Sequence, residues 1–174
     1  MFLLKHYRIF LISLILLVGC HSEQRKEEVA SDTTVITQNE NEWSGKVVKI
    51  TDGDTIEVLL NGKAVKIRLA DIDCPEKRQA YGTRAKQYTA DLCFGKIVKV
   101  VKVGTDRYQR IIGTVYLDNG TVLNKELLKV GLAWFYKKYS DKQDYADLEN
   151  EARQNRVGLW ADDEPTPPWE FRHH

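Results

Sequence analysis

The strongest constraint on the fold of this chain is a run of three short strand patterns between residues 46 and 69. Valine, isoleucine and leucine dominate the segments 46–50, 55–60 and 64–69, and interspersed polar residues give them the character of short strands. The pair Asn61-Gly62 separates the second and third segments and indicates a two-residue hairpin turn. The sequence therefore predicts three consecutive strands joined by tight turns.

The spacing of the apolar residues changes after the third strand. Ala85, Tyr88 and Leu92 are spaced as one face of a helix, which predicts a helix in this region. Strand patterns return at 97–101 and 111–117. The chain is therefore expected to run through three strands, a helix and two further strands.

Two more helices are expected in the last third of the chain. Asn124 is of the residue type that caps a short helix, here one that ends at Gly131, and residues 141–155 have the pattern of a last helix. Three strands, a helix and two strands is the element order of the OB-fold, a five-stranded Greek-key barrel. We predict a mainly β, α+β domain over residues 43–162, with such a barrel and about three helices, followed by a Pro-rich tail at 163–174.

The N-terminus has the pattern of an export signal. A short basic region precedes the apolar run 9–18, which is shorter than the roughly 20 residues of a membrane-spanning helix. Cys20 follows Leu-Val-Gly, and this segment resembles the lipobox of bacterial lipoproteins. We therefore expect a lipoprotein-type signal peptide at residues 1–19, lipidation of Cys20, and a flexible tether at 20–42.

This pattern predicts an exported protein that is anchored by its lipid to the bacterial cell membrane or outer membrane. The alternative is an ordinary signal peptide with an incidental cysteine at position 20. The protein would then be secreted or periplasmic.

The near-neutral charge of the chain conceals a segregated pattern. Residues 43–140 hold 18 basic and 10 acidic residues, a net charge of +8. Residues 20–42 carry −4 and residues 141–174 carry −5. A basic body between acidic flanks favours an anionic partner such as nucleic acid, although lysines on strands also serve simply to solvate their outer faces.

Histidines are confined to the ends of the chain. The four are His6, His21, His173 and His174. This placement argues against Ser-His-Asp or Cys-His catalysis and against His-ligated zinc within the predicted domain. An enzyme built from it would rely on carboxylates, arginines, lysines, tyrosines or an oxygen-bound metal.

Carboxylates gather at the predicted strand ends. Asp52 and Asp54 lie in the turn between the first two strands, and Asp73 and Glu76 follow the third. In a meander of these strands Asp54, Asp73 and Glu76 come close together, and a shared cation would offset their repulsion. Oxygen ligands without histidine or thiolate favour Ca²⁺ or Mg²⁺.

Two arginines complete a possible phosphodiesterase site. Arg68 lies on the third strand and Arg110 ends a polar loop, and guanidinium groups bind phosphate in a bidentate manner. With a metal ion they would stabilise charge on the phosphorus oxygens, while Glu76 positions or deprotonates the attacking water. Taken singly, these residues also have ordinary roles in turns, ion pairs and helix starts.

Four separated segments resemble the staphylococcal nuclease (thermonuclease) family. They read ITDGDTIEV, IRLADIDCPE, TDRYQR and GLAWFYKKY, and the likeness covers about residues 44–161. The family has an OB-fold barrel with three helices and cleaves DNA and RNA using Ca²⁺. The resemblance therefore implies a hydrolase, a calcium-dependent endonuclease with low sequence specificity.

The resemblance also implies roles for individual residues. Asp54, Asp73 and the backbone carbonyl of Cys74 would bind the metal, with Asp52 as a supporting acid behind them. Catalysis would fall to Arg68, Glu76 and Arg110, and substrate contacts would come from Arg107, Tyr108 and Tyr139. Tyrosines suit an unpaired strand because they stack on bases, so single-stranded DNA and RNA are the expected substrates of a monomeric protein. Mg²⁺ and Mn²⁺ remain alternatives to Ca²⁺.

Two readings compete with a nuclease. The first is a non-catalytic OB-fold lipoprotein that only binds single-stranded nucleic acid, although such a module would not need Glu76. The second is a surface adhesin or structural lipoprotein, which only the anchor supports.

Two cysteines lie within the predicted domain. Export would expose Cys74 and Cys93 to an oxidising compartment, where a disulfide between them is one option. Two small buried thiols are the favoured interpretation.

Overall fold

The structure, a computed structural model, describes residues 41–173. The predicted signal peptide, Cys20 and all but the end of the predicted tether lie outside the described residues. The first strand begins at Glu42, which the sequence analysis placed in the tether. Within residues 41–173 no helix is both long and apolar enough to cross a membrane.

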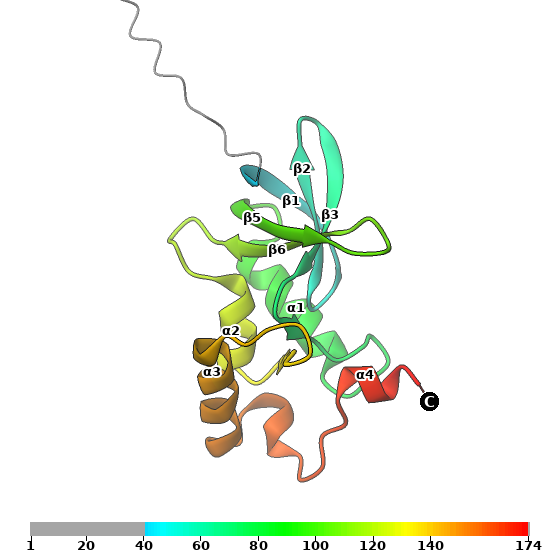
Figure 1. Cartoon of the computed structure of the whole chain (residues 1–174), viewed down its shortest axis with the longest axis vertical. Helices are drawn as coiled ribbons and strands as arrows, with labels where there is room; N and C mark the ends of the chain where they lie inside the picture. Colours follow the sequence, from blue (N-terminus) through cyan, green and yellow to red (C-terminus); the bar gives the residue numbers. More distant parts are fainter. Residues whose placement is uncertain (1–40, 174) are drawn as a thin grey trace, which may run out of the picture. The chain divides into compact units, whose positions relative to one another are not determined.

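Five strands close into a barrel in the order β1-β2-β3-β6-β5 (Figure 1). All neighbouring pairs are antiparallel except β3 and β6, whose parallel contact closes the barrel. This topology confirms the predicted OB-fold barrel. The strands are β1 (Glu42–Asp52), β2 (Thr55–Leu60), β3 (Lys63–Leu69), β5 (Ile97–Thr105) and β6 (Ile111–Tyr116).

The long strand β1 belongs to both halves of the barrel. Its residues 42–46 pair with β5, and its residues 47–52 pair with β2, with two register shifts in the second part. Such bulges bend a strand and increase its twist. The bend lets β1 pair with β5 at its start and with β2 at its end, where Asp52 is the last residue of the strand.

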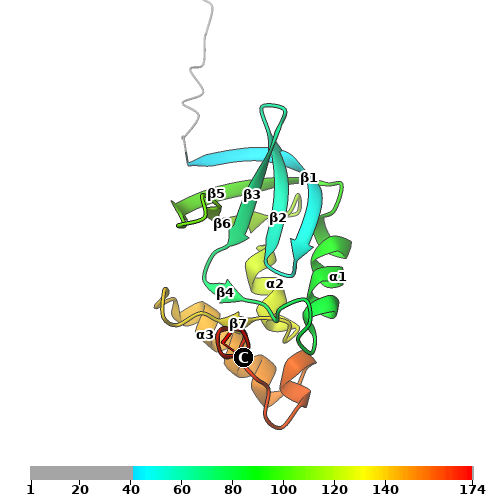
Figure 2. The ribbon, with the colours of Figure 1, turned by 90° about the vertical axis from the view of Figure 1, so that its right-hand side faces the viewer.

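Helices lie at one end of the barrel in both views (Figures 1 and 2). Helix α1 packs on β1, helix α2 contacts α1, α3 and β6, and the shared core is built from valine, isoleucine and leucine side chains. The helices are α1 (Gly82–Cys93), α2 (Leu123–Lys129), α3 (Gln143–Gln154) and α4 (Pro168–Phe171), with a 3-10 turn at Gly158–Ala161.

The predicted capping role of Asn124 is wrong. Helix α2 is preceded by Val122 and has no side-chain cap, whereas Asn124 lies inside the helix and is fully buried. Its Oδ1 accepts a hydrogen bond from the Val115 amide, and its Nδ2 donates to the carbonyls of Ala70 and Gly113. The side chain therefore ties α2 to the junction of β3 and β6, where the backbone would otherwise hold unpaired polar groups.

A small second sheet lies beside the barrel. Strand β4 (Ile72–Asp73) pairs antiparallel with β7 (Trp134–Phe135), and Asp73 faces Trp134 in the register. Each strand has two residues, too few to show a period, so the sequence analysis did not predict them. This pairing places the segment after β3 against the segment before α3.

The C-terminal segment 163–173 packs against the domain. Helix α4 begins at the second residue of the Pro167-Pro168 pair, Pro168 is buried, and Trp169 contacts the rings of Trp134 and Tyr136. Figure 2 shows α4 in front of β7. The segment that the sequence analysis treated as a tail thus lies beside the small sheet.

Candidate active site

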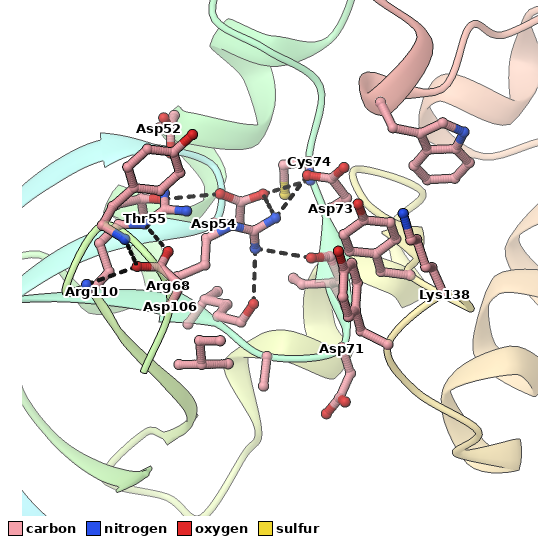
Figure 3. A pocket seen from close by; sticks show the side chains of 18 of the residues that line it. Asp52, Asp54, Thr55, Arg68, Asp71, Asp73, Cys74, Asp106, Arg110 and Lys138 are labelled. Atoms are coloured by element: carbon pink, nitrogen blue, oxygen red, sulfur yellow. Dashed lines mark hydrogen bonds and ion pairs between the residues drawn. The ribbon is translucent and has the colours of Figure 1, made fainter. Parts of the chain in front are cut away.

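An open cleft of about 960 Å³ lies where β2, β3 and the following loop meet the β5–β6 loop and the C-terminal segment (Figure 3). It brings together every site residue that the sequence analysis proposed within the domain. These are Asp52, Asp54, Arg68, Asp73, Cys74, Glu76, Arg107, Tyr108, Arg110 and Tyr139. Cys20 lies outside the described residues.

The turn between β1 and β2 is positioned by Gly53. A Cβ at this residue would lie 2.8 Å from the Ala85 Cβ and 2.9 Å from the Cys74 Sγ, so only glycine fits without displacing a neighbour. The Thr89 hydroxyl on α1 donates to the Gly53 carbonyl at 2.6 Å. The turn is thereby fixed against α1, and its two flanking aspartates point toward the cleft.

Asp54 is held through both of its carboxylate oxygens. Its Oδ1 accepts a hydrogen bond from the Thr55 hydroxyl, and its Oδ2 accepts one from the Cys74 amide at 2.7 Å. The side chain is buried. The structure thus links Asp54 to the backbone of Cys74, whose carbonyl stays a predicted metal ligand.

Arg68 lies between the two predicted metal-binding carboxylates. Its Nη2 is 2.7 Å from Asp73 Oδ1 and 3.2 Å from Asp54 Oδ2, while Nη1 donates to the carbonyls of Leu69 and Ile72. Figure 3 shows both carboxylates facing this guanidinium. Burial lowers the pKa of Arg68, but Asp54 and Asp73 more than offset that effect and raise it above the ordinary value. Arg68 therefore stays charged and offsets part of the negative charge of the two acids.

Asp73 is the most enclosed acid of the cleft and contacts a second guanidinium. Its Oδ2 accepts a hydrogen bond from Arg172 Nη2 at 2.7 Å. Burial raises the pKa of Asp73, while hydrogen bonding from Arg172 and the charge of Arg68 offset part of the increase. Such a carboxylate needs a cation beside it to stay ionised.

Asp52 has an unmatched acceptor at the edge of this group. Its Oδ1 is buried and has no hydrogen-bond partner. Burial, with the nearby Asp54 carboxylate, raises the pKa of Asp52 to about 6. An orphaned oxygen beside further carboxylates fits a site that receives a cation or a bound water.

The carboxylate oxygens of this region are the type of ligand that a hard divalent cation prefers. Asp52, Asp54 and Asp73 offer carboxylate oxygens in one buried region, and their mutual repulsion is at present offset by guanidinium groups. Among residues 41–173, no group of three His, Cys, Asp or Glu side chains is arranged to hold a metal ion. The carboxylate ligands that a metal ion would need are present, and in this structure they pair with arginine side chains.

Glu76 lies at the rim of the cleft and is about one third exposed. Its Oε1 accepts a hydrogen bond from Arg172 Nη1 at 2.7 Å, and its amide donates to the Gln79 side chain. The carboxylate is therefore accessible to water but engaged with an arginine.

In the β5–β6 loop, the Asp106 carboxylate organises a turn that holds Arg110. Asp106 Oδ1 accepts hydrogen bonds from the amides of Tyr108 and Arg110, and Oδ2 accepts one from Arg110 Nε at 2.7 Å. Burial would raise the pKa of Asp106, but the hydrogen bonds from Arg110 and Tyr108 outweigh it and hold the pKa below its usual value. Because only Nε is used by Asp106, the Nη groups of Arg110 stay free of that contact.

The residues proposed to contact substrate surround this centre. Arg107 donates to the Tyr108 hydroxyl and stacks over its ring, 4.8 Å from the centroid. Tyr108 and Tyr139 are 64% and 70% exposed, unusual values for large aromatic side chains. Rings and cations so exposed suit bases and phosphates of an unpaired strand.

Four of the cleft residues that the sequence did not predict lie beside the small sheet or in the C-terminal segment. They are Tyr136, Trp169, Arg172 and His173. The expectation that the folded part has no histidine is wrong in this respect, because His173 lines the cleft. The only sequence signal for a helix in this segment is Pro168, which is of the type favoured at the first helical position, and a four-residue helix carries no pattern that indicates which site it reaches.

The domain cysteines are both buried and free, which confirms the favoured interpretation over a disulfide. Burial raises the pKa of both thiols, that of Cys93 to about 12. Neither sulfur is a reactive nucleophile in this state.

The chain is similar to known nucleases over most of its domain. A family model described as staphylococcal nuclease homologue matches residues 66–162. An uncharacterized endonuclease of Escherichia coli is 46% identical over 129 residues, which span 74% of this chain and 84% of that protein. A micrococcal nuclease of Shigella flexneri is 43% identical over 142 residues, covering 75% of this chain and 81% of its own length.

A third relative, from Haemophilus influenzae, is an uncharacterized endonuclease with 44% identity over 128 residues, covering 73% of this chain and 71% of that protein. The chain therefore belongs to the staphylococcal nuclease family.

Proposed function

We propose that this nuclease is a calcium-dependent endonuclease that hydrolyses phosphodiester bonds of DNA and RNA with low sequence specificity. Family membership supports phosphodiester hydrolysis and a nucleic acid substrate. One observation carries the finer proposal: a single cleft contains the Asp54–Arg68–Asp73 cluster together with Glu76 and Arg110.

The carboxylates of this cluster are the proposed cation ligands. Asp54 and Asp73 would hold Ca²⁺ with the backbone carbonyl of Cys74, and the orphaned Asp52 oxygen supports them from behind. When bound, the cation supplies positive charge that polarises the scissile phosphate.

The arginines bind and stabilise the phosphate. Arg110 uses its Nη groups, which Asp106 leaves available, while Asp106 fixes the orientation of the side chain through Nε. Arg68 approaches from the floor of the cleft, oriented by the carbonyls of Leu69 and Ile72. Guanidinium groups positioned before the reaction stabilise the charge that develops on the phosphoryl oxygens.

Glu76 is the proposed general base. It lies at the solvent-accessible rim, where a water can hydrogen bond to its carboxylate and lose a proton to it. Its hydrogen bond to Arg172 must open before it can act.

The exposed groups around the centre favour a single-stranded substrate. Tyr108 and Tyr139 offer their ring faces to unstacked bases, and Arg107 offers charge to a neighbouring phosphate. A duplex would present its phosphates to Arg107 but no unstacked bases to the tyrosines.

We further propose that the protein acts as an exported monomer anchored through Cys20. The lipobox-like sequence before Cys20 supports export and lipidation. The acidic linker that follows would keep the domain in solution near the membrane surface.

The test is cleavage of circular single-stranded DNA by the purified full chain, with Ca²⁺ and with excess EDTA. A circle yields fragments only to an endonuclease. We expect cleavage with Ca²⁺ and none with EDTA, and Mg²⁺ and Mn²⁺ are compared in parallel. DNA binding without cleavage under every metal condition would favour the non-catalytic binding module instead.

A further inference from the structure

We propose that the C-terminal segment 163–173 is a built-in inhibitor that occupies the cation site with its own arginine. Arg172 acts as an internal cation for Asp73 and Glu76 and leaves when Ca²⁺ binds. This inference rests on the proposed function, because it assigns a regulator to the same carboxylates.

Every side-chain hydrogen bond of Arg172 in the described structure goes to these two acids. Nη2 is 2.7 Å from Asp73 Oδ2, and Nη1 is 2.7 Å from Glu76 Oε1 and 3.3 Å from Asp73 Oδ1. The Arg172 guanidinium therefore contacts both a proposed metal ligand, Asp73, and the proposed general base, Glu76. Both acids strengthen its charge, since they raise the pKa of Arg172 despite partial burial.

This contact is incompatible with the proposed catalytic state. Asp73 gives Oδ1 to Arg68 and Oδ2 to Arg172, so both of its oxygens already face positive charge. A Ca²⁺ ion at the same oxygens would be repelled by the two guanidinium groups. While Glu76 Oε1 accepts a hydrogen bond from Arg172, that oxygen is not available to an attacking water.

Arg172, and not Arg68, is the group that can leave. Arg68 is anchored by two backbone carbonyls, and its side chain is 14% exposed. The Arg172 side chain donates to no backbone carbonyl among the described residues and is 39% exposed, and Arg172 directly follows the four-residue helix α4 outside the barrel. Release of α4 would break no strand pairing.

The segment is nevertheless held in a defined place. Trp169 stacks on Tyr136 with ring centroids 5.5 Å apart and an interplanar angle of 4°, and its edge meets Trp134. Gln79 donates to the Thr166 carbonyl at 2.6 Å and accepts from the Glu76 amide. The same glutamine therefore contacts both the segment and the residue that the segment blocks.

The stacked pair also connects the inhibitor to the substrate surface. Tyr136 lies edge-on to Tyr139, with centroids 4.9 Å apart, and Tyr139 is a proposed base contact. Trp169 covers the face of Tyr136 that a base would otherwise reach. Release of the segment would thus expose the carboxylates of Asp73 and Glu76 together with one face of Tyr136.

The experiment compares the full-length wild-type chain with the variant Arg172→Gln. Isothermal titration with Ca²⁺ in the absence of nucleic acid gives the dissociation constant, and hydrogen exchange follows residues 166–173 with and without Ca²⁺. Arg84→Gln is the matched control, because Arg84 is an exposed arginine on α1 that does not line the cleft.

We expect Arg172→Gln to bind Ca²⁺ at least about fivefold more tightly than wild type, the effect of losing a partly exposed competing cation. Ca²⁺ should accelerate exchange in residues 166–173 of the wild type and leave the barrel strands protected. Trp169→Ala, which loosens the segment without touching a carboxylate, should shift Ca²⁺ affinity in the same direction and serves if Arg172→Gln does not fold.

The two proposals fail in different ways. Equal or weaker Ca²⁺ binding by both variants, in chains that cleave DNA with Ca²⁺, would overturn the inhibitor and leave the nuclease standing. Slower exchange of residues 166–173 with Ca²⁺ would also overturn it. Absence of both Ca²⁺ binding and cleavage in every variant would overturn the calcium-dependent function and the inhibitor together.

Discussion

The guanidinium of Arg68 lies 2.7 Å from the Asp73 carboxylate, and their side chains are 14% and 1% exposed. The second carboxylate, Asp54, shares the same Nη2. The centre of the cleft is thus a mostly buried cluster in which Arg68 contacts both acids and Arg172 contacts Asp73 as well. Removal of Arg68 would leave the buried Asp54 without an ion-pair partner among the described residues, which is costlier than the loss of a surface ion pair.

Arg68→Ala should therefore reduce stability as well as activity. Without Ca²⁺ we expect the free energy of unfolding to fall by about 3–5 kcal/mol, measured by urea denaturation in EDTA. Lys49→Ala is the control, because Lys49 forms an exposed pair with Glu57 and should cost no more than about 1 kcal/mol. Equal losses in the two variants would show that the buried cluster has no special role in stability.

The Asp106 turn should hold its ordered state to unusually low pH. The folded pKa of Asp106 lies below its unfolded value, so its hydrogen bonds are complete above the unfolded pKa and are lost as pH falls through the folded one. NMR should show the Tyr108 and Arg110 amide signals shifting together with a midpoint below 3.8. In Asp106→Asn this step should disappear; its persistence would assign the titration to another group.

The thiols of Cys74 and Cys93 should not react with thiol reagents in the folded protein. Cys93 is fully buried and has a pKa of about 12, and Cys74 is buried too, so neither forms thiolate at pH 8. With Cys20→Ser, a thiol reagent at pH 8 should report no cysteine before denaturation and two afterwards. Rapid reaction of either thiol in the native state would contradict the described burial.

Lipidation of Cys20 is tested by expression in a bacterium fed with labelled fatty acid. We expect the wild-type chain to carry label and to partition with membranes, and Cys20→Ser to lose both properties. An unlabelled wild-type protein in the soluble exported fraction would favour an ordinary signal peptide.

The barrel could be predicted from the sequence because each strand has its own composition and turn signals. The segment 55–60 coincides with β2, and the hairpin pair Asn61-Gly62 joins it to β3, with both residues at positive φ. Local turn chemistry and strand composition are sufficient where each element is stabilised by near neighbours in the sequence.

The roles of side chains that act between distant parts of the chain could not be predicted from the sequence. Asn124 matched a cap locally, but its partners Ala70 and Gly113 come from other parts of the chain, and burial of their carbonyls determines its role. Arg172 lies 96 residues after Glu76, and no spacing rule connects them. Its place depends on aromatic packing of Trp169, which a four-residue helix does not reveal in its sequence.

Single-turnover cleavage by Glu76→Gln tests the central claim most directly. The claim is that this cleft performs metal-dependent phosphodiester hydrolysis with Glu76 as base. With saturating Ca²⁺ and denatured DNA, we predict a rate about 10²–10⁴-fold below wild type with DNA binding essentially unchanged. Glu57→Gln, a matched change on β2 outside the cleft, should keep the wild-type rate. A wild-type rate in Glu76→Gln would contradict the account.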